Sequence, residues 1–217
     1  MSEEDLQCSD LGNSTTSWGA RDMRHCIVDD LNTPYSLGQF IWSGIDYIGE
    51  PTPYHTRNCY FGQADTAGFP KDVYYLFRSI WNDEKMIHIG MRWDWNPKQM
   101  IDVRVMSNAN SVELYLNGAS LGRQAINLND PEQCCPGWKI PYEAGELRAI
   151  GYDASGNVIV EEVKHTPADA AKIILKSEDG SLKADGMPQT SARVCSRISQ
   201  HPDYPCCRSP AHKCRPD

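Results

Sequence analysis

The sequence predicts a fold in two parts, a short α/β segment followed by an antiparallel β-sandwich. Between residues 19 and 82, helical periodicity flanks one short, nearly continuous apolar run, a combination typical of α/β structure. Beyond residue 100, apolar and polar residues alternate in short runs separated by polar turns, which is typical of a small antiparallel sandwich. The change of pattern places the boundary within residues 83–100.

The α/β segment is expected to consist of a helix, a buried strand, a long loop and a second helix. Residues 19–32 carry apolar side chains at helical spacing on one face. The run YSLGQFIWSGID follows, as expected of a strand that is buried on both faces. Pro70 and Asp72 are typical of a helix start. The apolar face of that second helix is expected to be formed by Val73, Leu76, Phe77, Ile80 and Trp81.

In the second part, the alternation predicts both the strands and their inward faces. The inward side chains are expected to be Ile101, Val103, Val105, Val112, Leu114 and Leu116. The dipeptide Asn117-Gly118 predicts a tight hairpin. The stretch DASGN predicts the turn of another hairpin, and AKIILKS adds a last strand.

Residues 189–217 differ from the rest of the chain. They hold four prolines, four cysteines and few large apolar side chains, so burial is not expected to offset the entropy of ordering them. We therefore expect a disordered tail. A zinc site is the alternative, although the usual spacing such as C-x2-C is absent. Its ligands would come from Cys195, His201, Cys206, Cys207, His212 and Cys214.

The composition is that of a globular protein and argues against several partners. The chain has 217 residues, of which 40% are hydrophobic, and its net charge of −8 argues against nucleic acid. No apolar run approaches the ~20 residues that cross a bilayer, so no membrane is expected. The acidic start, MSEEDLQCSDLG, lacks the apolar core of a signal peptide. The nine cysteines lack framework spacing, which favours reduced thiols.

The loop after the apolar run carries the best site candidates. Trp42 lies at the carboxyl end of the expected buried strand, where substrates bind in an α/β barrel, and its indole could stack on the apolar face of a sugar ring; a core tryptophan is the other interpretation. Asp46 and Glu50 follow, but four extended residues span ~13 Å, and paired carboxyl groups in glycoside hydrolysis lie about 5 to 9.5 Å apart. We expect these two to bond loop backbone rather than to form a catalytic pair. Trp93 and Trp95 share the stacking interpretation with less support.

No nucleotide-binding, phosphate-binding or serine-hydrolase motif is found. We therefore expect no cofactor and no metal. The histidines at positions 25, 55, 88 and 165 have no neighbouring nucleophile at recognisable spacing, and ordinary structural roles are expected for them.

Two long stretches carry a resemblance to a known family. FIWSGIDYIGEPTPY and CYFGQADTAGFPKDVYYLFRSIW closely resemble the last strand and closing helix of the catalytic barrel of glycoside hydrolase family 2, most of all in bacterial β-galactosidases. Three further stretches, VELYLNGASLGR, WKIPYEAGELRAIGYD and LKADG, resemble the β-sandwich that follows this barrel. The resemblance covers roughly residues 7–187 and keeps the family's order.

The resemblance implies a fold class of α/β plus all-β. Residues 1–90 would be the C-terminal remnant of a (β/α)8 barrel, and residues 91–178 an immunoglobulin-like antiparallel β-sandwich. Residues 179–217 would begin a truncated further domain and end in the tail. After LKADG the family would continue into another sandwich strand, so a misjoined reading frame or a genuine variable tail would explain the change.

The resemblance also implies an activity, retaining hydrolysis of β-galactosides by two glutamates. Because QCSDLGNSTTSWG is similar to the segment after the nucleophile's strand, both glutamates are expected upstream of Met1, and the chain alone is expected to be inactive. Trp42 matches a tryptophan that lines the sugar subsite, and Asp46 and Glu50 match positions near the same rim. The expected partners are a β-galactoside or related glycan and the missing N-terminal part of the enzyme. The bacterial cytoplasm is the compartment that we favour.

Two other functions stay open. The sandwich could be a carbohydrate-binding or purely structural module, with Tyr115, Trp138 and Tyr142 as its candidate aromatic row. The chain could also be an interaction module that pairs with another barrel fragment.

Overall fold

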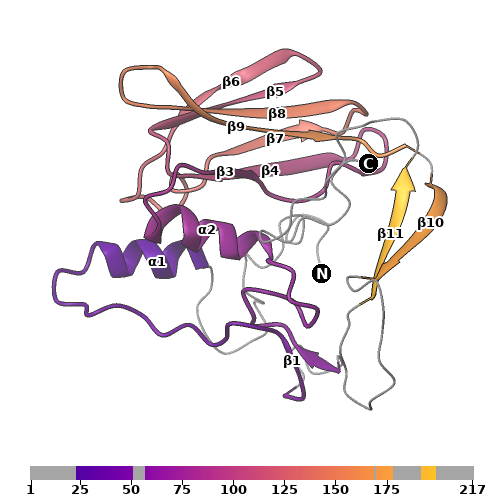
Figure 1. The fold of residues 1–217 in the computed structure, drawn as a ribbon. Helices are drawn as coiled ribbons and strands as arrows, with labels where there is room; N and C mark the ends of the chain where they lie inside the picture. The colour runs from indigo at the N-terminus through magenta and orange to yellow at the C-terminus, as the bar shows by residue number, and fades with distance from the viewer. Residues whose placement is uncertain (1–22, 51–56, 169, 178–191, 199–217) are drawn as a thin grey trace. The chain divides into compact units, whose positions relative to one another are not determined.

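The computed structural model describes residues 23–50, 57–168, 170–177 and 192–198, with side chains described through residue 168 (Figure 1). The chain divides into two compact units after Thr166. Among the described residues, the first unit contains two helices, two larger antiparallel sheets and one short two-stranded sheet, and the second contains one pair of strands.

The two predicted helices are confirmed. Helix α1 (Met23–Leu31) buries Ile27 and Val28, and helix α2 (Asp72–Trp81) buries Val73, Leu76 and Phe77. Trp81 closes α2 with more than half of its surface exposed, and its ring packs on Phe77 at a centroid distance of 4.7 Å. The buried face of α2 is therefore narrower than the sequence predicts.

The apolar run before the loop does not form the predicted buried strand. Phe40 is fully exposed and Trp42 is 70% exposed. A buried parallel strand needs paired neighbours on both sides, whereas within the described ranges this run has backbone pairing only with residues 61–64. There the Asp46 amide donates to the Ala64 carbonyl at 2.9 Å.

The loop continues into two short strands. Strand β1 (Tyr47–Ile48) pairs antiparallel with β2 (Asn58–Cys59), which brings Tyr47 opposite Cys59. A parallel bridge between Ile45 and Ala64 precedes this pair. The segment is thus a folded loop held by a few backbone contacts rather than the edge of a wide sheet.

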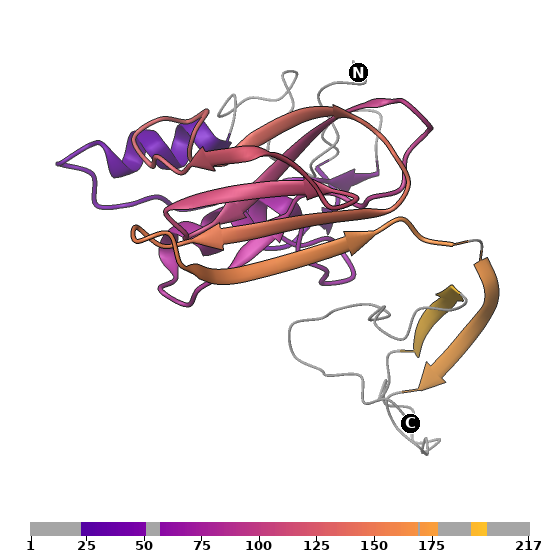
Figure 2. The same ribbon diagram turned by 90° about the horizontal axis from the view of Figure 1, so that it is seen from above.

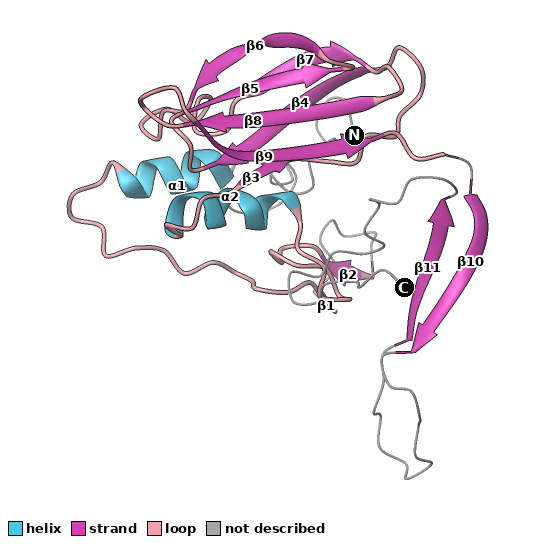
Figure 3. Cartoon of the chain, turned by 45° about the horizontal axis from the view of Figure 1, so that its top comes forward, coloured by secondary structure: helices cyan, strands magenta, loops and turns pink. Residues whose placement is uncertain are grey.

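Two antiparallel sheets form the larger part of the first unit, and Figures 2 and 3 show them as two layers. The strands are β3 (Ile87–Ile89), β4 (Met100–Ser107), β5 (Ser111–Leu116), β6 (Ala119–Ala125), β7 (Gly137–Pro141), β8 (Glu146–Tyr152) and β9 (Val158–His165). One sheet has the order β3-β4-β7 and the other β6-β5-β8-β9. The strands and hairpins predicted beyond residue 100 are confirmed, and β3 and β7 add to them.

The predicted inward faces and turns are also confirmed. All six side chains expected to face inward on β4 and β5 are buried. Asn117 and Gly118 have φ values of 50° and 81°, as a two-residue hairpin of the mirror-image type requires. In the β8–β9 turn, Asp153 Oδ1 accepts the amide hydrogens of Ser155 and Asn157, both at 2.8 Å.

One hydrophobic core joins the helices to both sheets. It contains Ile27 of α1 and Leu76 of α2 together with Val103 and Leu147 of the sheets. Trp93 lies in this core at 2% exposure, and its indole donates to the Glu143 carbonyl at 3.1 Å. The sugar-stacking interpretation of Trp93 is therefore wrong. A division into domains at residue 90 stays a prediction.

The second unit pairs β10 (Ala170–Ser177) with β11 (Ala192–Ile198), in antiparallel register with Ile174 opposite Cys195. Strand β10 corresponds to the last strand that the sequence predicts. Strand β11 lies within the segment for which the sequence predicts an unstructured tail. The remaining members of the considered zinc set lie outside the described residues.

Candidate functional site

Asp46 holds the base of the loop that follows Trp42. Its side chain is buried, and Oδ1 accepts hydrogen bonds from the Gly62 amide at 2.8 Å and from Lys71 Nζ at 2.7 Å. Lys71 precedes α2 and also reaches the Tyr60 carbonyl at 3.3 Å. A buried carboxylate is stable only when it is paired and hydrogen-bonded. Asp46 therefore ties the loop to the start of α2, in line with the expectation that it bonds loop backbone.

Gly62 allows the two segments of the loop to approach closely. A Cβ atom at this position would lie 2.1 Å from the Asp46 nitrogen and 2.5 Å from the Ala64 carbonyl oxygen. These are backbone atoms, so no side-chain rotation could relieve the contact. The sequence offers no local signal for this requirement, because it arises from residues 16 positions away.

Trp42, Tyr47 and Glu50 form a hydrogen-bonded chain on the exposed side of the loop. The Trp42 indole Nε1 donates to Tyr47 Oη at 3.0 Å, and Tyr47 Oη donates to the Glu50 carboxylate. The Trp42 and Tyr47 rings also meet edge to face, with centroids 6.5 Å apart and an interplanar angle of 83°. The exposed indole is thus fixed along its edge.

The environment of Tyr47 keeps its phenol protonated. The hydrogen bond to the Glu50 carboxylate is the main cause that raises the pKa of Tyr47 to about 12. Losing the phenolic proton would remove this bond and set two negative oxygens against each other. Tyr47 is therefore a neutral donor and acceptor at physiological pH.

The two carboxylates proposed from the sequence are engaged separately. Asp46 is buried and ion-paired with Lys71, whereas Glu50 is exposed and bonded to Tyr47. Sequence reasoning proposed Trp42, Asp46 and Glu50 as site residues, and it did not single out Tyr47 and Lys71, which bond to them in the structure. Their contacts depend on the fold of the loop. What the arrangement offers chemically is a flat apolar ring beside a carboxylate and a phenol, suited to the mixed surface of a sugar.

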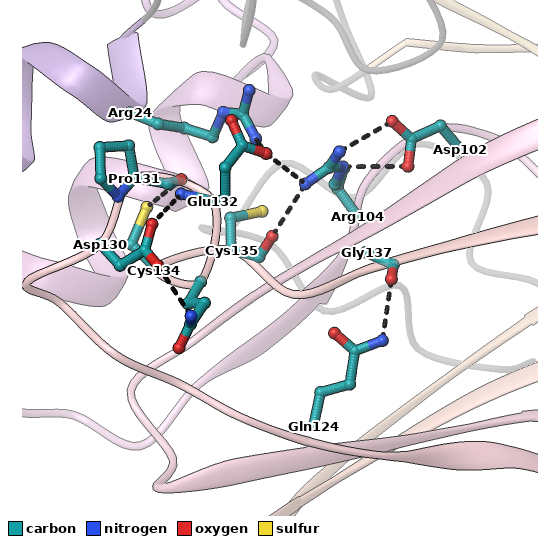
Figure 4. A network of polar contacts seen from close by, with 11 residues as sticks. Arg24, Asp102, Arg104, Gln124, Asp130, Pro131, Glu132, Cys134, Cys135 and Gly137 are labelled. Atoms are coloured by element: carbon teal, nitrogen blue, oxygen red, sulfur yellow. Dashed lines mark hydrogen bonds and ion pairs between the residues drawn. The ribbon is translucent and has the colours of Figure 1, made fainter.

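A separate polar network links α1 to the sandwich (Figure 4). Arg24 of α1 pairs with Glu132 at 3.2 Å, and Arg104 of β4 forms two 3.0 Å bonds to Asp102. Arg104 also reaches the carbonyl of Cys135 at 3.4 Å. Burial raises the pKa of the Cys135 thiol, which keeps it protonated and unreactive. The network is therefore structural.

His88 of β3 links α2 to the sandwich. Its Nε2 lies 3.0 Å from Asp72 Oδ1, and its ring stacks on Tyr75 with centroids 3.6 Å apart. Asp72 Oδ2 also accepts the Met91 amide at 3.1 Å. On the other side, Nδ1 lies 3.8 Å from Glu162 of β9. This cluster joins three elements and accounts for His88 by a structural role.

In the part of the chain that the structure describes, no group of three or more His, Cys, Asp or Glu residues is arranged to hold a metal ion. No helix among these residues has both the length and the apolar character needed to span a bilayer.

The chain is similar to several known proteins. Residues 98–160 match a family described as a domain of unknown function (DUF4982). Over 190 residues the chain is 38% identical to the beta-galactosidase BoGH2A of Bacteroides ovatus, a match covering 86% of this chain and 22% of that protein. It is 37% identical over 186 residues to a putative beta-glucuronidase of Formosa agariphila, covering 82% of this chain and 17% of that protein.

Solved structures agree. A beta-glycosidase from Bacteroides vulgatus matches with a TM-score of 0.68 and 26% identity, covering 82% of this chain and 22% of that one. A glycosyl hydrolase family 2 member from Bacteroides cellulosilyticus has a TM-score of 0.68 at 24% identity, a likeness of fold alone, covering 76% and 26%. The chain spans about a fifth of the length of the curated relatives that it matches. It belongs to glycoside hydrolase family 2 and corresponds to a part of that family's enzymes.

Proposed function

We propose that this chain is the C-terminal portion of a retaining, β-galactosidase-like glycoside hydrolase, and that its loop of residues 38–62 forms one wall of the sugar site. The observation that carries the proposal is the exposed Trp42 indole, whose edge is fixed by Tyr47 beside Glu50. The sugar ring stacks on the indole face, which buries apolar area and leaves the hydroxyl groups free for hydrogen bonds.

Catalysis requires groups beyond this wall. In a retaining enzyme one carboxylate attacks the anomeric carbon while another carboxylic acid protonates the leaving oxygen. Asp46 is committed to Gly62 and Lys71 under the loop, and Glu50 to Tyr47, so neither is assigned one of these roles. The two glutamates come from another part of the barrel, and the present chain binds rather than cleaves.

Exposed apolar side chains are frequent among the described residues between 31 and 69, and they support a partner of the same origin. These side chains are Leu31, Tyr35, Leu37, Phe40, Ile45, Ile48, Tyr60 and Phe69. Apolar surface gathered along one segment of a protein normally marks an interface. Since the relatives are about five times as long as the matched region, the rest of the barrel of the same enzyme covers these side chains. Co-purification with a longer hydrolase chain tests this assignment.

The sandwich is proposed as a structural support rather than a carbohydrate-binding module. Two of the three aromatic residues considered for an exposed row, Trp138 and Tyr142, are buried. Tyr142 instead packs against Trp93 in the core, with ring centroids 5.0 Å apart. Glycan-array binding by the sandwich strands would contradict this assignment.

The decisive experiment compares galactoside binding by the chain and by two tryptophan variants. Methyl β-galactoside should perturb the indole NMR signal of Trp42, and Trp42→Ala should abolish the binding. Trp81→Ala is the matched control, because Trp81 is also more than half exposed but lies on α2. The chain alone should not hydrolyse an aryl β-galactoside. Turnover that is lost in Glu50→Gln, or binding unaffected by Trp42→Ala, would overturn the proposal.

A further inference from the structure

Tyr47 is the middle member of the two hydrogen bonds that connect the exposed Trp42 indole to Glu50. Trp42 has one polar atom, the donor Nε1, and it is used by Tyr47 Oη at 3.0 Å. The phenol then has one hydrogen left to donate, and Glu50 accepts it. The donor and acceptor capacities therefore match in only one direction, from Trp42 through Tyr47 to Glu50.

We infer that Tyr47 is a positioning residue, which fixes the orientation of the Trp42 indole for stacking on a neutral sugar ring, with Glu50 fixing Tyr47 in turn. This inference deepens the proposed function and rests on it for the identity of the ligand. The geometry itself stands apart from the ligand, because the hydrogen bonds and the edge-to-face contact are present in the chain alone.

The physical benefit is pre-organisation. An exposed aromatic side chain samples several rotamers, and binding must then order it at an entropic cost. The hydrogen bond and the ring contact hold the indole edge and leave its face open, so less freedom is lost on stacking. A tyrosine phenol is neutral at physiological pH even at its ordinary pKa, and the Glu50 bond raises that pKa further, so the Tyr47 hydroxyl keeps its hydrogen throughout this range.

The backbone conformation of the loop places Glu50 where it accepts the hydrogen bond from Tyr47. Glu50 has a φ of 42° and follows Gly49 with a φ of 110°, so two successive residues take the left-handed region. Only glycine adopts this region freely, and a glutamate there needs a compensating interaction. Its hydrogen bond with Tyr47 supplies one.

The test uses the whole chain and the indole N–H signals of its six tryptophans. Trp42→Phe identifies the Trp42 signal. Tyr47→Phe keeps the ring but removes the hydroxyl, and it should move the Trp42 signal upfield and speed its exchange with water while leaving the other indole signals in place. Glu50→Gln, which keeps the shape of the side chain, should change the same signal. Tyr35→Phe is the matched control, since Tyr35 is an exposed tyrosine of the same segment.

The outcomes separate the inference from the proposed function. A Trp42 signal that is unchanged in both Tyr47→Phe and Glu50→Gln would overturn the inference, whatever sugar is bound. A Trp42 signal that responds, together with methyl β-galactoside affinity weakened about 2- to 10-fold in Tyr47→Phe, supports both. If the Trp42 signal responds but the protein binds no galactoside, the positioning role of Tyr47 is supported and the proposed ligand is contradicted.

Discussion

At the scale of single residues, the loop depends on one glycine and one buried ion pair. Gly62 lets two backbone segments touch, and Asp46 with Lys71 fills the space beneath them. The close approach at Gly62 and the Asp46–Lys71 pair together hold the backbone from which Trp42 and Tyr47 extend. The site is therefore sensitive to changes below its surface.

Gly62→Ala should open the loop. The added methyl group would overlap backbone atoms of Asp46 and Ala64, and overpacking of this kind costs about 1–3 kcal/mol. Hydrogen exchange should show faster exchange at the Asp46 amide, which donates to Ala64. Gly44→Ala is the control, because a Cβ there meets nothing within 4 Å. Equal protection in both variants would contradict the close approach described for Gly62.

Glu113 gives the stability of the β5–β6–β8 surface a pH dependence. The hydrogen bond from Ser120 is the main cause that lowers the pKa of Glu113, and the Tyr152 hydroxyl also donates to it. A lowered pKa in the folded state adds stability above the ordinary glutamate pKa, and this is lost as pH falls through the folded value. Because Glu113 is partly exposed and water screens its charge, the effect should stay below about 1 kcal/mol.

Urea unfolding at pH 7 and pH 3 checks this sign. Glu113→Gln should be less stable than the wild type at pH 7, and the difference should shrink towards pH 3, because the contribution of the lowered pKa is lost as the carboxylate takes up its proton. Glu143→Gln, at an exposed position, is the control. A difference that grows on acidification would reverse the assignment.

At the scale of elements, alternation and turn residues predicted the sheets well because both signals are local. Val112, Leu114 and Leu116 face inward as their spacing indicates, and Asn117-Gly118 makes the turn. The prediction of a buried strand around Phe40 was wrong for the opposite reason. Whether such a run becomes a buried strand depends on neighbouring strands far away in sequence, which no local pattern reports.

The candidate site divides in the same way. Trp42, Asp46 and Glu50 were identified from the sequence by residue type and by resemblance. The hydrogen bond from Trp42 to Tyr47 and the ion pair from Lys71 to Asp46 arise only when the loop folds. Residue type and resemblance therefore proposed these three candidates, but they could not assign which carboxylate lies beneath the loop and which faces solvent.

The β10–β11 pair yields a prediction for the second unit. Deleting residues after Pro188 removes β11, the strand with which β10 pairs in the described part of the second unit. Hydrogen exchange of β10 amides should rise, whereas the melting temperature of the first unit should not change. Measurements with and without reductant and chelator should agree. Unchanged protection of β10 would mean that the pairing does not persist in solution.

At the scale of the whole first unit, helices and sheets share one core. Leu76 of α2 is fully buried in the cluster that also contains Val103 and Leu147. This packing makes the two parts of the unit mutually dependent, although they differ in sequence pattern. It bears directly on the predicted division at residue 90.

Leu76→Ala should destabilise the sandwich as well as the helix. Such a change costs about 2–5 kcal/mol when the leucine is buried. Hydrogen exchange of the sandwich amides, measured at increasing urea concentration, should then show unfolding at a lower urea midpoint than in the wild type. Leu37→Ala is the matched control, because Leu37 is fully exposed. An unchanged urea midpoint for the sandwich amides in Leu76→Ala would instead support independent domains on the two sides of residue 90.

The adjacent thiols of Cys134 and Cys135 offer a built-in chemical reporter of this dependence. Both are buried, in the loop that Glu132 connects to Arg24 of α1. An alkylating reagent can reach them only after the loop has left the core, so their labelling rate counts openings of the contact between α1 and the sandwich. Mass spectrometry of timed alkylation could therefore rank variants by how often the two parts separate, even where their equilibrium melting curves coincide.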